Sequence, residues 1–328
     1  MHQLHINTPL SEIGAVLRRS REVLVITHVS PDGDAIGSLL GLYWLLLSPG
    51  RKAAPRVTLA CADRVPAQFG FLPGADKIVQ DLPARPWDVV VALDASDTHR
   101  LGSPFQPATY GSAPVVNLDH HITNLYFGQL NYVDPNAAAT AQSVVRLAGE
   151  MGLKIGKEAA LCLLTGLVSD TLGFRTSNVT PEVMATAMRL MKAGANLAEI
   201  TERILNHMPL SLMRLWGLAL AELRVEGQLV WTHITREMRV QAGAPEESDG
   251  GLVSYLIKAP EARVAAVFAE KANGEVEVDL RARPGYDVSN VALSLGGGGH
   301  PQAAGCTIPG PLAEAEARVL PLLLGISS

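Results

Sequence analysis

The 328-residue sequence has little of what would mark a disulfide-rich or membrane-embedded protein. It contains only three cysteines, Cys61, Cys162 and Cys306, which are odd in number and far apart. This usage argues against a disulfide framework or a cysteine-ligated zinc site and is typical of the reducing cytoplasm. No secretory signal is recognisable, and the apolar stretch from Leu39 to Leu47 is too short to span a bilayer. We therefore expect a cytoplasmic protein with no membrane partner.

An excess of positive charge is also missing. Lysine and arginine number 27 against 32 aspartate and glutamate residues, a net charge of −5. A broad basic surface for long nucleic acid is thereby excluded, whereas a short anionic substrate held by metal ions is compatible with this charge. Hydrophobic residues at 48% and charged residues at 18% are ordinary for a globular protein, and the length predicts two domains.

The first half of the chain alternates short β-branched runs with helical segments. Strands are expected at residues 23–27, 56–60, 88–93 and 114–118, and helices at residues 35–47, 137–150, 157–172 and 181–193. Such alternation predicts an α/β fold, with a mostly parallel sheet covered by helices on both faces.

The pattern changes after about residue 195. Two helices are expected at residues 198–206 and 210–222, followed by strands at residues 229–234, 263–270 and 275–281. Asn273-Gly274 between the last two strands is a strong hairpin signal. We therefore expect a first domain at residues 1–195, a helical linker at residues 196–222 and a smaller α+β domain at residues 223–328.

Acidic and imidazole side chains follow the predicted strands of the first domain. The first strand runs into His28-Val29-Ser30-Pro31-Asp32-Gly33-Asp34, the third ends at Asp94, and the fourth ends at Asp119-His120-His121. Asp170 lies near the end of the helix that begins around residue 157. Open parallel sheets bind their ligands at the carboxyl ends of the strands, so we expect these groups to meet there.

Electrostatic repulsion favours a metal site at this place. Several carboxylates in one crevice repel one another, and these segments contain no lysine or arginine before Arg100. Divalent cations would offset the charge, and carboxylates mixed with imidazole suit manganese, with magnesium or cobalt as alternatives. Two ions about 3.5–4 Å apart can clamp a phosphoryl displacement. Each segment alone has an ordinary explanation as a turn or a cap, but together they favour a two-metal site.

The same segments resemble the motifs of a known family, the DHH phosphoesterases. The matches, in the family's order, are HVSPDGDAIGS at residues 28–38, ALDASDTHRLG at 92–102, NLDHHITN at 117–124 and TGLVSDTLGFRTSN at 165–178. A fifth, GGGGHPQAAG at residues 296–305, resembles the glycine-rich motif of the associated DHHA1 substrate-binding domain.

This resemblance implies a role for each matching position in the first domain. His28 and Asp32 would bind one metal ion, Asp94 would bridge two ions, and Asp34, His120 and Asp170 would complete the second site. Asp119 would accept a hydrogen bond behind the histidines and fix a ring orientation. His121 would lie near the leaving group as a proton donor or phosphate ligand, unless it is only a structural neighbour of His120.

For the second domain, the resemblance implies a phosphate or nucleotide site. Gly297, Gly298 and Gly299 would let backbone N–H groups approach a phosphate as an anion nest, and His300 would add a donor. Arg281, at the end of a predicted strand, resembles the arginine that the family uses to hold a substrate phosphate, for which a planar fork is well suited.

In length and layout the chain most resembles the short two-domain members of the family, of the nanoRNase and pAp-phosphatase type. These degrade oligonucleotides of a few units and remove the 3′-phosphate of adenosine 3′,5′-bisphosphate (pAp). The implied enzyme is a manganese-dependent phosphohydrolase, and a homodimer is a further expectation. It would use two ions and a bridging hydroxide to attack short RNA, short DNA or pAp.

Other activities within the family stay open at this point. They are a RecJ-like single-strand DNA exonuclease, a cyclic or linear dinucleotide phosphodiesterase, and a family II pyrophosphatase. A catalytically silent nucleotide-binding protein of the same fold is a further alternative, because fold alone does not establish activity.

Overall fold

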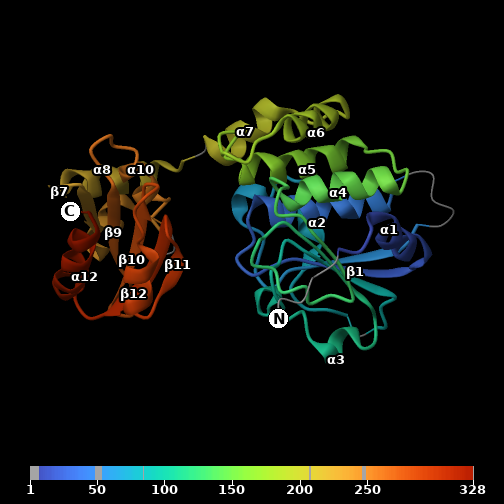
Figure 1. The fold of residues 1–328 in the computed structure, drawn as a ribbon, viewed down its shortest axis with the longest axis horizontal. Helices are drawn as coiled ribbons and strands as arrows, with labels where there is room; N and C mark the ends of the chain where they lie inside the picture. The colour runs from blue at the N-terminus through green and yellow to red at the C-terminus, as the bar shows by residue number, and fades with distance from the viewer. Residues whose placement is uncertain (1–6, 49–53, 84, 207, 246–248, 328) are drawn as a thin grey trace. The chain divides into compact units, whose positions relative to one another are not determined.

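The structure is a computed structural model that describes residues 7–48, 54–83, 85–206, 208–245 and 249–327. The chain divides into two compact units, residues 1–207 and 208–328, here called the large and the small unit (Figure 1). Helix α7 (Leu197–Leu205) belongs to the large unit and helix α8 (Leu210–Ala221) to the small unit. The domain boundaries expected at residues 195 and 222 stay predictions.

The large unit is built on a parallel sheet. Among the described residues six strands pair in the order β3-β2-β1-β4-β5-β6, every pair parallel. The strands are β1 (Glu22–Ile26), β2 (Arg56–Ala60), β3 (Ile78–Val79), β4 (Val89–Leu93), β5 (Val115–Asp119) and β6 (Leu130–Val133). The order reverses between the neighbours β1 and β4, which is the point where such sheets open a ligand crevice at the carboxyl ends of their strands. The predicted α/β class is confirmed.

Helices cover both faces of this sheet unequally. One face carries the main core, formed with α1 (Leu10–Arg19), α2 (Gly33–Leu46), α4 (Thr140–Glu150) and α5 (Lys157–Asp170), with α6 (Pro181–Lys192) and α7 packed against α5 (Figure 1). The short helices η1 (Ala67–Phe69) and η2 (Ala75–Lys77) also border this core. The other face is covered by the segment containing η3 (His99–Leu101) and α3 (Pro107–Tyr110). Strands β4 and β5 are buried throughout; β4 is apolar along its whole length, and β5 is apolar except at Asn117 and Asp119.

Helices α2 and α5 approach each other unusually closely. A Cβ atom at Gly37 of α2 would lie 2.5 Å from the carbonyl oxygen of Cys162 in α5. A Cβ atom at Gly166 of α5 would lie 2.7 Å from Asp34 Oδ1. Only glycine leaves room for this contact, which brings the acidic ends of the two helices together.

The small unit is an α+β unit with a mixed sheet. Its described strands pair in the order β11-β12-β10-β9-β8-β7, where β8 and β9 are parallel and the other pairs antiparallel. They are β7 (Arg224–Glu226), β8 (Leu229–Ile234), β9 (Val264–Glu270), β10 (Glu275–Ala282), β11 (Gly298–His300) and β12 (Ala303–Pro309). Helices α8, α9 (Arg236–Ala242) and α10 (Leu252–Leu256) pack on one face, and α11 (Ser289–Ser294) and α12 (Leu312–Ser327) on the other. The hairpin expected at Asn273-Gly274 joins β9 to β10, with Gly274 at φ +81°.

Two expected helix boundaries differ from the structure. The helix expected from residue 137 begins at Thr140, because the Gln142 side chain accepts the Ala138 amide and caps the preceding turn. The helix expected to reach residue 172 ends at Asp170, because the backbone turns left-handed from Leu172. Within the glycine run, residues 298–300 form strand β11.

Within the described parts of the chain, no helix combines the length and the apolar character needed to cross a bilayer.

Candidate metal centre

The centre begins where the strand order reverses, at the ends of β1 and β4. His28 follows β1 and Asp94 follows β4, and His28 Nε2 lies 3.5 Å from Asp94 Oδ2. Both side chains are at most 3% exposed. Asp94 adopts φ +59°, a conformation rare outside glycine that is frequent at functional sites. The topology alone therefore places a buried imidazole beside a buried carboxylate.

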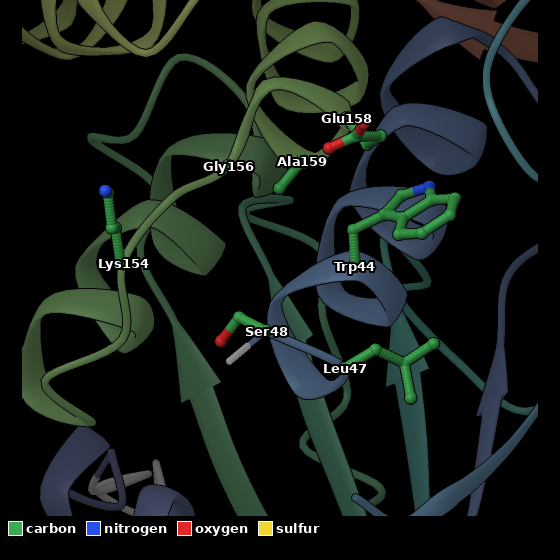
Figure 2. Close-up of a pocket in the computed structure, with 7 residues that line it drawn as sticks. All are labelled: Trp44, Leu47, Ser48, Lys154, Gly156, Glu158 and Ala159. Carbon is green, nitrogen blue, oxygen red and sulfur yellow. The ribbon is translucent and has the colours of Figure 1, made fainter. Parts of the chain in front are cut away.

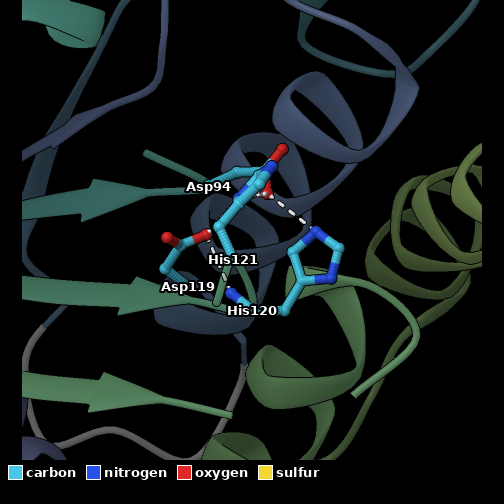
Figure 3. A group of neighbouring side chains, drawn as sticks. All are labelled: Asp94, Asp119, His120 and His121. Atoms are coloured by element: carbon cyan, nitrogen blue, oxygen red, sulfur yellow. Dashed lines mark hydrogen bonds and ion pairs between the residues drawn. The ribbon is translucent and has the colours of Figure 1, made fainter. Parts of the chain in front are cut away.

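The Asp-His-His triplet lies at the end of the neighbouring strand β5 (Figure 3). His121 Nδ1 is 2.8 Å from Asp119 Oδ1, and the Asn124 side-chain amide donates to Asp119 Oδ2 at 2.6 Å. Burial acts to raise the pKa of Asp119, but the bonds from His121, Asn124 and the His120 amide hold it below its usual value. Asp119 is thus a charged acceptor that orients His121.

Helix α2 contributes two carboxylates from its first turn. Asp32 caps the helix by accepting the amides of Asp34 and Ala35, both at 3.0 Å. Asp34 is fully buried and accepts the backbone amides of Thr140 and Ala141, at 2.5 and 3.0 Å, at the start of α4. Backbone amides at a helix N-terminus favour an anion, so α4 helps to hold Asp34 in place.

Helix α5 brings the last predicted carboxylate. Asp170 is the final residue of α5, and its Oδ2 lies 3.2 Å from His120 Nε2. His120 Nε2 also lies 3.5 Å from Asp94 Oδ1, so it stands between the two carboxylates.

Among the described residues, these side chains form three groups whose ligand atoms lie within 4.8 Å of one another. The groups are His28, Asp32 and Asp94; Asp34, His120 and Asp170; and Asp94, Asp119, His120 and His121. All six residues expected to bind metal are therefore brought together, and Asp94 belongs to two of the groups.

The imidazole rings are held in the form that a metal requires. His28 Nδ1 is 2.7 Å from the Val29 carbonyl, His120 Nδ1 is 3.4 Å from the Ala137 carbonyl, and His121 Nδ1 meets the Asp119 carboxylate. Carbonyl and carboxylate oxygens only accept, so Nδ1 carries a proton in each ring, and Nε2 is the nitrogen left to bind a metal or to carry a second proton. The Arg100 guanidinium, 3.2 Å from His28 Nδ1, then makes only a close contact with a protonated nitrogen.

The charges of the centre call for cations. Burial and the neighbouring Asp94 and Asp170 raise the pKa of Asp34 well above its usual value, and burial raises that of Asp170 to about 6. Burial acts to lower the pKa of His28 and His120, yet the surrounding carboxylates raise both to about 10. Protons are thus drawn into the cluster to offset its negative charge, which divalent ions on carboxylate and imidazole ligands would do instead. The donor set fits such ions.

Two of the substrate residues expected in the small unit, Arg281 and His300, lie on one face of its sheet. Arg281 of β10 pairs with Ala303 of β12, which pairs with His300 of β11. Arg281 and His300 therefore stand in one row with a small side chain between them. The anion nest needs correction at its first position, because the Gly297 amide donates to the Ala292 carbonyl at 2.8 Å and closes α11.

The three glycines of the expected anion nest differ in how much space surrounds them; they are Gly297, Gly298 and Gly299. A Cβ at Gly297 would lie 2.1 Å from the Gly305 carbonyl oxygen, so packing alone requires glycine there. Gly299, at φ +141°, is likewise crowded by Ala304, whereas Gly298 has open space around it. A ligand could approach the backbone at Gly298.

One residue of the centre carries no signal in the strand-end pattern. Thr140 donates its amide to Asp34 and its hydroxyl to Asp94, the latter at 2.9 Å. It begins α4, far from every motif, and only the alanine-rich turn before it hints at a helix start.

A separate cavity of about 520 Å³ in the large unit contains none of the predicted site residues (Figure 2). It is lined by Trp44, Leu47, Ser48, Lys154, Gly156, Glu158 and Ala159.

Fold and site together define a phosphoesterase-like α/β unit followed by a smaller α+β unit. Residues 22–167 match the DHH family, N-terminal domain, and residues 234–323 match the DHHA1 domain. The chain is 41% identical to the bifunctional oligoribonuclease and PAP phosphatase NrnA of Thermus thermophilus, over 91% of this chain and 88% of that protein. The chain belongs to the DHH family. The resemblance drawn from the motifs, and with it the expectation of a phosphoester hydrolase, is confirmed.

Two further comparisons extend this result. A probable manganese-dependent inorganic pyrophosphatase of Streptococcus agalactiae is 29% identical over 54% of this chain and 58% of that protein. The crystal structure of an exopolyphosphatase-related protein from Bacteroides fragilis superposes with a TM-score of 0.88 at 23% identity, covering 97% of this chain and 96% of that one. The likeness to the Bacteroides structure supports the assignment of the fold.

Proposed function

We propose that the protein is a manganese-dependent phosphohydrolase that cleaves short oligoribonucleotides and removes the 3′-phosphate of pAp. The proposal is supported by the convergence of six candidate metal ligands in a chain that is 41% identical to the Thermus oligoribonuclease and PAP phosphatase. The net charge of −5 agrees with a short substrate held locally rather than along a basic surface. A cytoplasmic location and a homodimer stay predictions.

In this proposal the donor groups divide between two ions. His28 and Asp32 would hold one ion, Asp34, His120 and Asp170 the other, and Asp94 would contact both. Bound there, the ions would supply Lewis-acid polarisation of phosphoryl oxygens and a water of lowered pKa. Manganese is favoured because the ligands are carboxylate oxygens and imidazole nitrogens.

The chain's own residues would position the substrate and move a proton. Asp119 fixes the His121 ring through Nδ1, which leaves Nε2 on a side chain that is 43% exposed. His121 can therefore hold a proton at Nε2 and donate it to the leaving oxygen. Arg281 and His300 would bind a second phosphate or the nucleotide with donors from one row of the small unit's sheet.

A substrate panel with Mn²⁺ tests this function. We expect turnover of an RNA dinucleotide and of pAp, with rates that fall as RNA lengthens toward thirty units. Faster turnover of longer single-stranded DNA would support a RecJ-like exonuclease instead. Selective turnover of cyclic or linear dinucleotides, or of pyrophosphate, would indicate those activities. Folded protein with no activity on any of these would reject the proposal.

The bridging position has its own test. Asp94→Asn should lower kcat by at least about a thousandfold and reduce the number of tightly bound Mn²⁺ ions, because both proposed sites share this carboxylate. The exposed Asp76→Asn serves as the matched control and should behave like wild type. Normal activity in the Asp94 variant would show that Asp94 does not bridge.

A further inference from the structure

The small unit has a cavity of about 330 Å³ on its sheet, lined by β10, β12 and the start of the glycine run. Ligand pockets commonly begin at about this size. Asp279 of β10 lines the cavity and pairs with Gly305 of β12, which pairs with Gly298 of β11. This row is two residues along the strands from the row of Arg281 and His300. Because side chains alternate along a strand, both rows face the same side of the sheet.

Asp279 places a partly buried carboxylate in this cavity. Its Oδ1 would lie 3.6 Å from a Cβ atom at Gly305, so the carboxylate borders the space that this glycine leaves open. Among the described residues, no hydrogen bond or ion pair reaches this carboxylate, and burial, with Asp249 and Glu277, raises its pKa to about 6. A buried acceptor without a donor costs free energy, and a ligand that supplies N–H groups would remove this cost.

A metal ion does not explain this carboxylate. Asp279 belongs to none of the groups of candidate metal ligands among the described residues, and Glu277 beside it is already ion-paired with Lys271. The neighbouring row instead offers Arg281 and His300 as donors for an anion. A ligand that satisfies both rows therefore combines an anionic group with N–H donors, which is the chemistry of a nucleotide.

A charged carboxylate discriminates among the bases. At pH 7.5, above its pKa of about 6, Asp279 has two acceptor oxygens and no hydrogen to donate. Guanine presents two adjacent donors on its pairing edge, N1–H and the N2 amino group. Adenine, cytosine and uracil each present a donor next to an acceptor on that edge. Guanine is thus the base that can donate to both oxygens of Asp279 at once.

We propose that Asp279 binds the pairing edge of a guanine base, while a phosphate of the same nucleotide lies at Arg281 and His300. The base would lie over Gly305 and Gly298, which have no side chains, and the space around Gly298 is open. The inference rests on the proposed function, and it adds that the enzyme selects for the base as well as for length. The adenine of pAp makes one hydrogen bond to Asp279 where guanine makes two.

Calorimetry of GMP, IMP and AMP binding to the full-length protein with Mn²⁺ tests the assignment. The three share ribose and phosphate, and IMP differs from GMP only in lacking the N2 amino group. At pH 7.5 wild type should bind GMP about tenfold or more tightly than IMP or AMP, because a hydrogen bond to a charged group is lost. Asp279→Asn, whose amide can donate to N1 of adenine and accept from its amino group, should instead prefer AMP. The exposed Glu226→Gln of β7 is the control and should keep the guanine preference.

Equal affinities for the three nucleotides in wild type, or an unchanged guanine preference in Asp279→Asn, would overturn the assignment. Rates on the dinucleotides GpG and ApA separate it from the function on which it rests. If neither is hydrolysed but Asp279 confers a preference for GMP, the proposed function fails and the base site stands. If both are hydrolysed and the three nucleotides bind alike, the base site fails alone. A melting temperature of Asp279→Asn at or above that of wild type shows that the fold is retained.

Discussion

The hydroxyl of Thr140 donates a hydrogen bond to Asp94 at 2.9 Å. Because the Thr140 amide also binds Asp34, one residue orients carboxylates from β4 and α2. Thr140→Val keeps the shape and the amide but removes the hydroxyl. We expect Mn²⁺ affinity or kcat to fall about tenfold to a hundredfold, as is usual when a partner of a metal ligand is lost. Titration with Mn²⁺ and initial rates measure both.

The control for Thr140 is Thr186→Val on α6. Among the described residues, the Thr186 hydroxyl bonds only the Glu182 carbonyl, at 3.0 Å, so this variant makes the same chemical change away from the centre. If Thr140→Val binds Mn²⁺ and turns over substrate like Thr186→Val, the hydroxyl has no part in orienting Asp94.

Metal removal should destabilise the large unit through its crowded carboxylates. Asp170→Asn removes one charge from the cluster of Asp34, Asp94 and His120, so after chelation this variant should melt a few degrees above wild type. Saturating Mn²⁺ should reverse the order of the two melting temperatures, because a ligand that binds more tightly stabilises the folded state more. Calorimetric melting with EDTA and with Mn²⁺ tests this. Equal gains from Mn²⁺ in both proteins would exclude Asp170 as a ligand.

Arg281 should act on substrate capture rather than on the chemical step. It lies in the small unit, and its Nη1 donates only to the Leu280 carbonyl among the described residues. Arg281→Ala is expected to raise KM for pAp about tenfold or more with a small change in kcat. Arg236→Ala, an exposed arginine of the same unit, provides the comparison. A loss confined to kcat would contradict a binding role.

Asp279 gives the stability of the small unit a pH dependence. Burial, Asp249 and Glu277 raise its pKa to about 6, against roughly 4 for an unfolded chain. The folded state therefore binds a proton at Asp279 more tightly than the unfolded chain does. The stabilisation that this proton gives to the folded state is complete below pH 4 and is lost as the pH rises through 6. Asp279→Asn should thus raise the free energy of unfolding by about 1–2 kcal/mol at pH 7.5, and by less at pH 4.5.

Urea unfolding at the two pH values checks the Asp279 prediction. Glu226→Gln, an exposed acid on β7, should show no comparable pH-dependent gain. A gain in Asp279→Asn that is the same at both pH values would mean that the carboxyl does not titrate in this window.

Much of the large unit follows from local sequence. The buried strands β1, β4 and β5 are nearly continuous apolar runs, and parallel strands place their carboxyl ends at one edge. The order of the parallel strands therefore predicts that His28, Asp94 and His120 lie close together. Strand order does not predict the position of Asp170, because this residue ends a helix. Its place near His120 depends on the close packing of α5 against α2.

The parts that escaped prediction depend on tertiary contacts or on short segments. Thr140 has no motif, and its two bonds exist only after α4 packs against α2 and β5. Strand β6, with the sequence LNYV, is short and only half-buried, and β11 consists of Gly298, Gly299 and His300, a composition that usually indicates a turn. The strand conformation of β11 depends on its pairing with β12, because its own residues do not favour a strand.

The glycine contact between α2 and α5 has a consequence for the metal chemistry. Because a methyl group at Gly166 would press on Asp34, the close contact of the two helices sets the distance between Asp34 and Asp170, the carboxylates proposed to hold the second ion. A larger residue at Gly166 would push these carboxylates apart and favour a wider cation. Under the proposed function, the preference of the site for one cation radius would thus depend partly on positions that do not contact the ion.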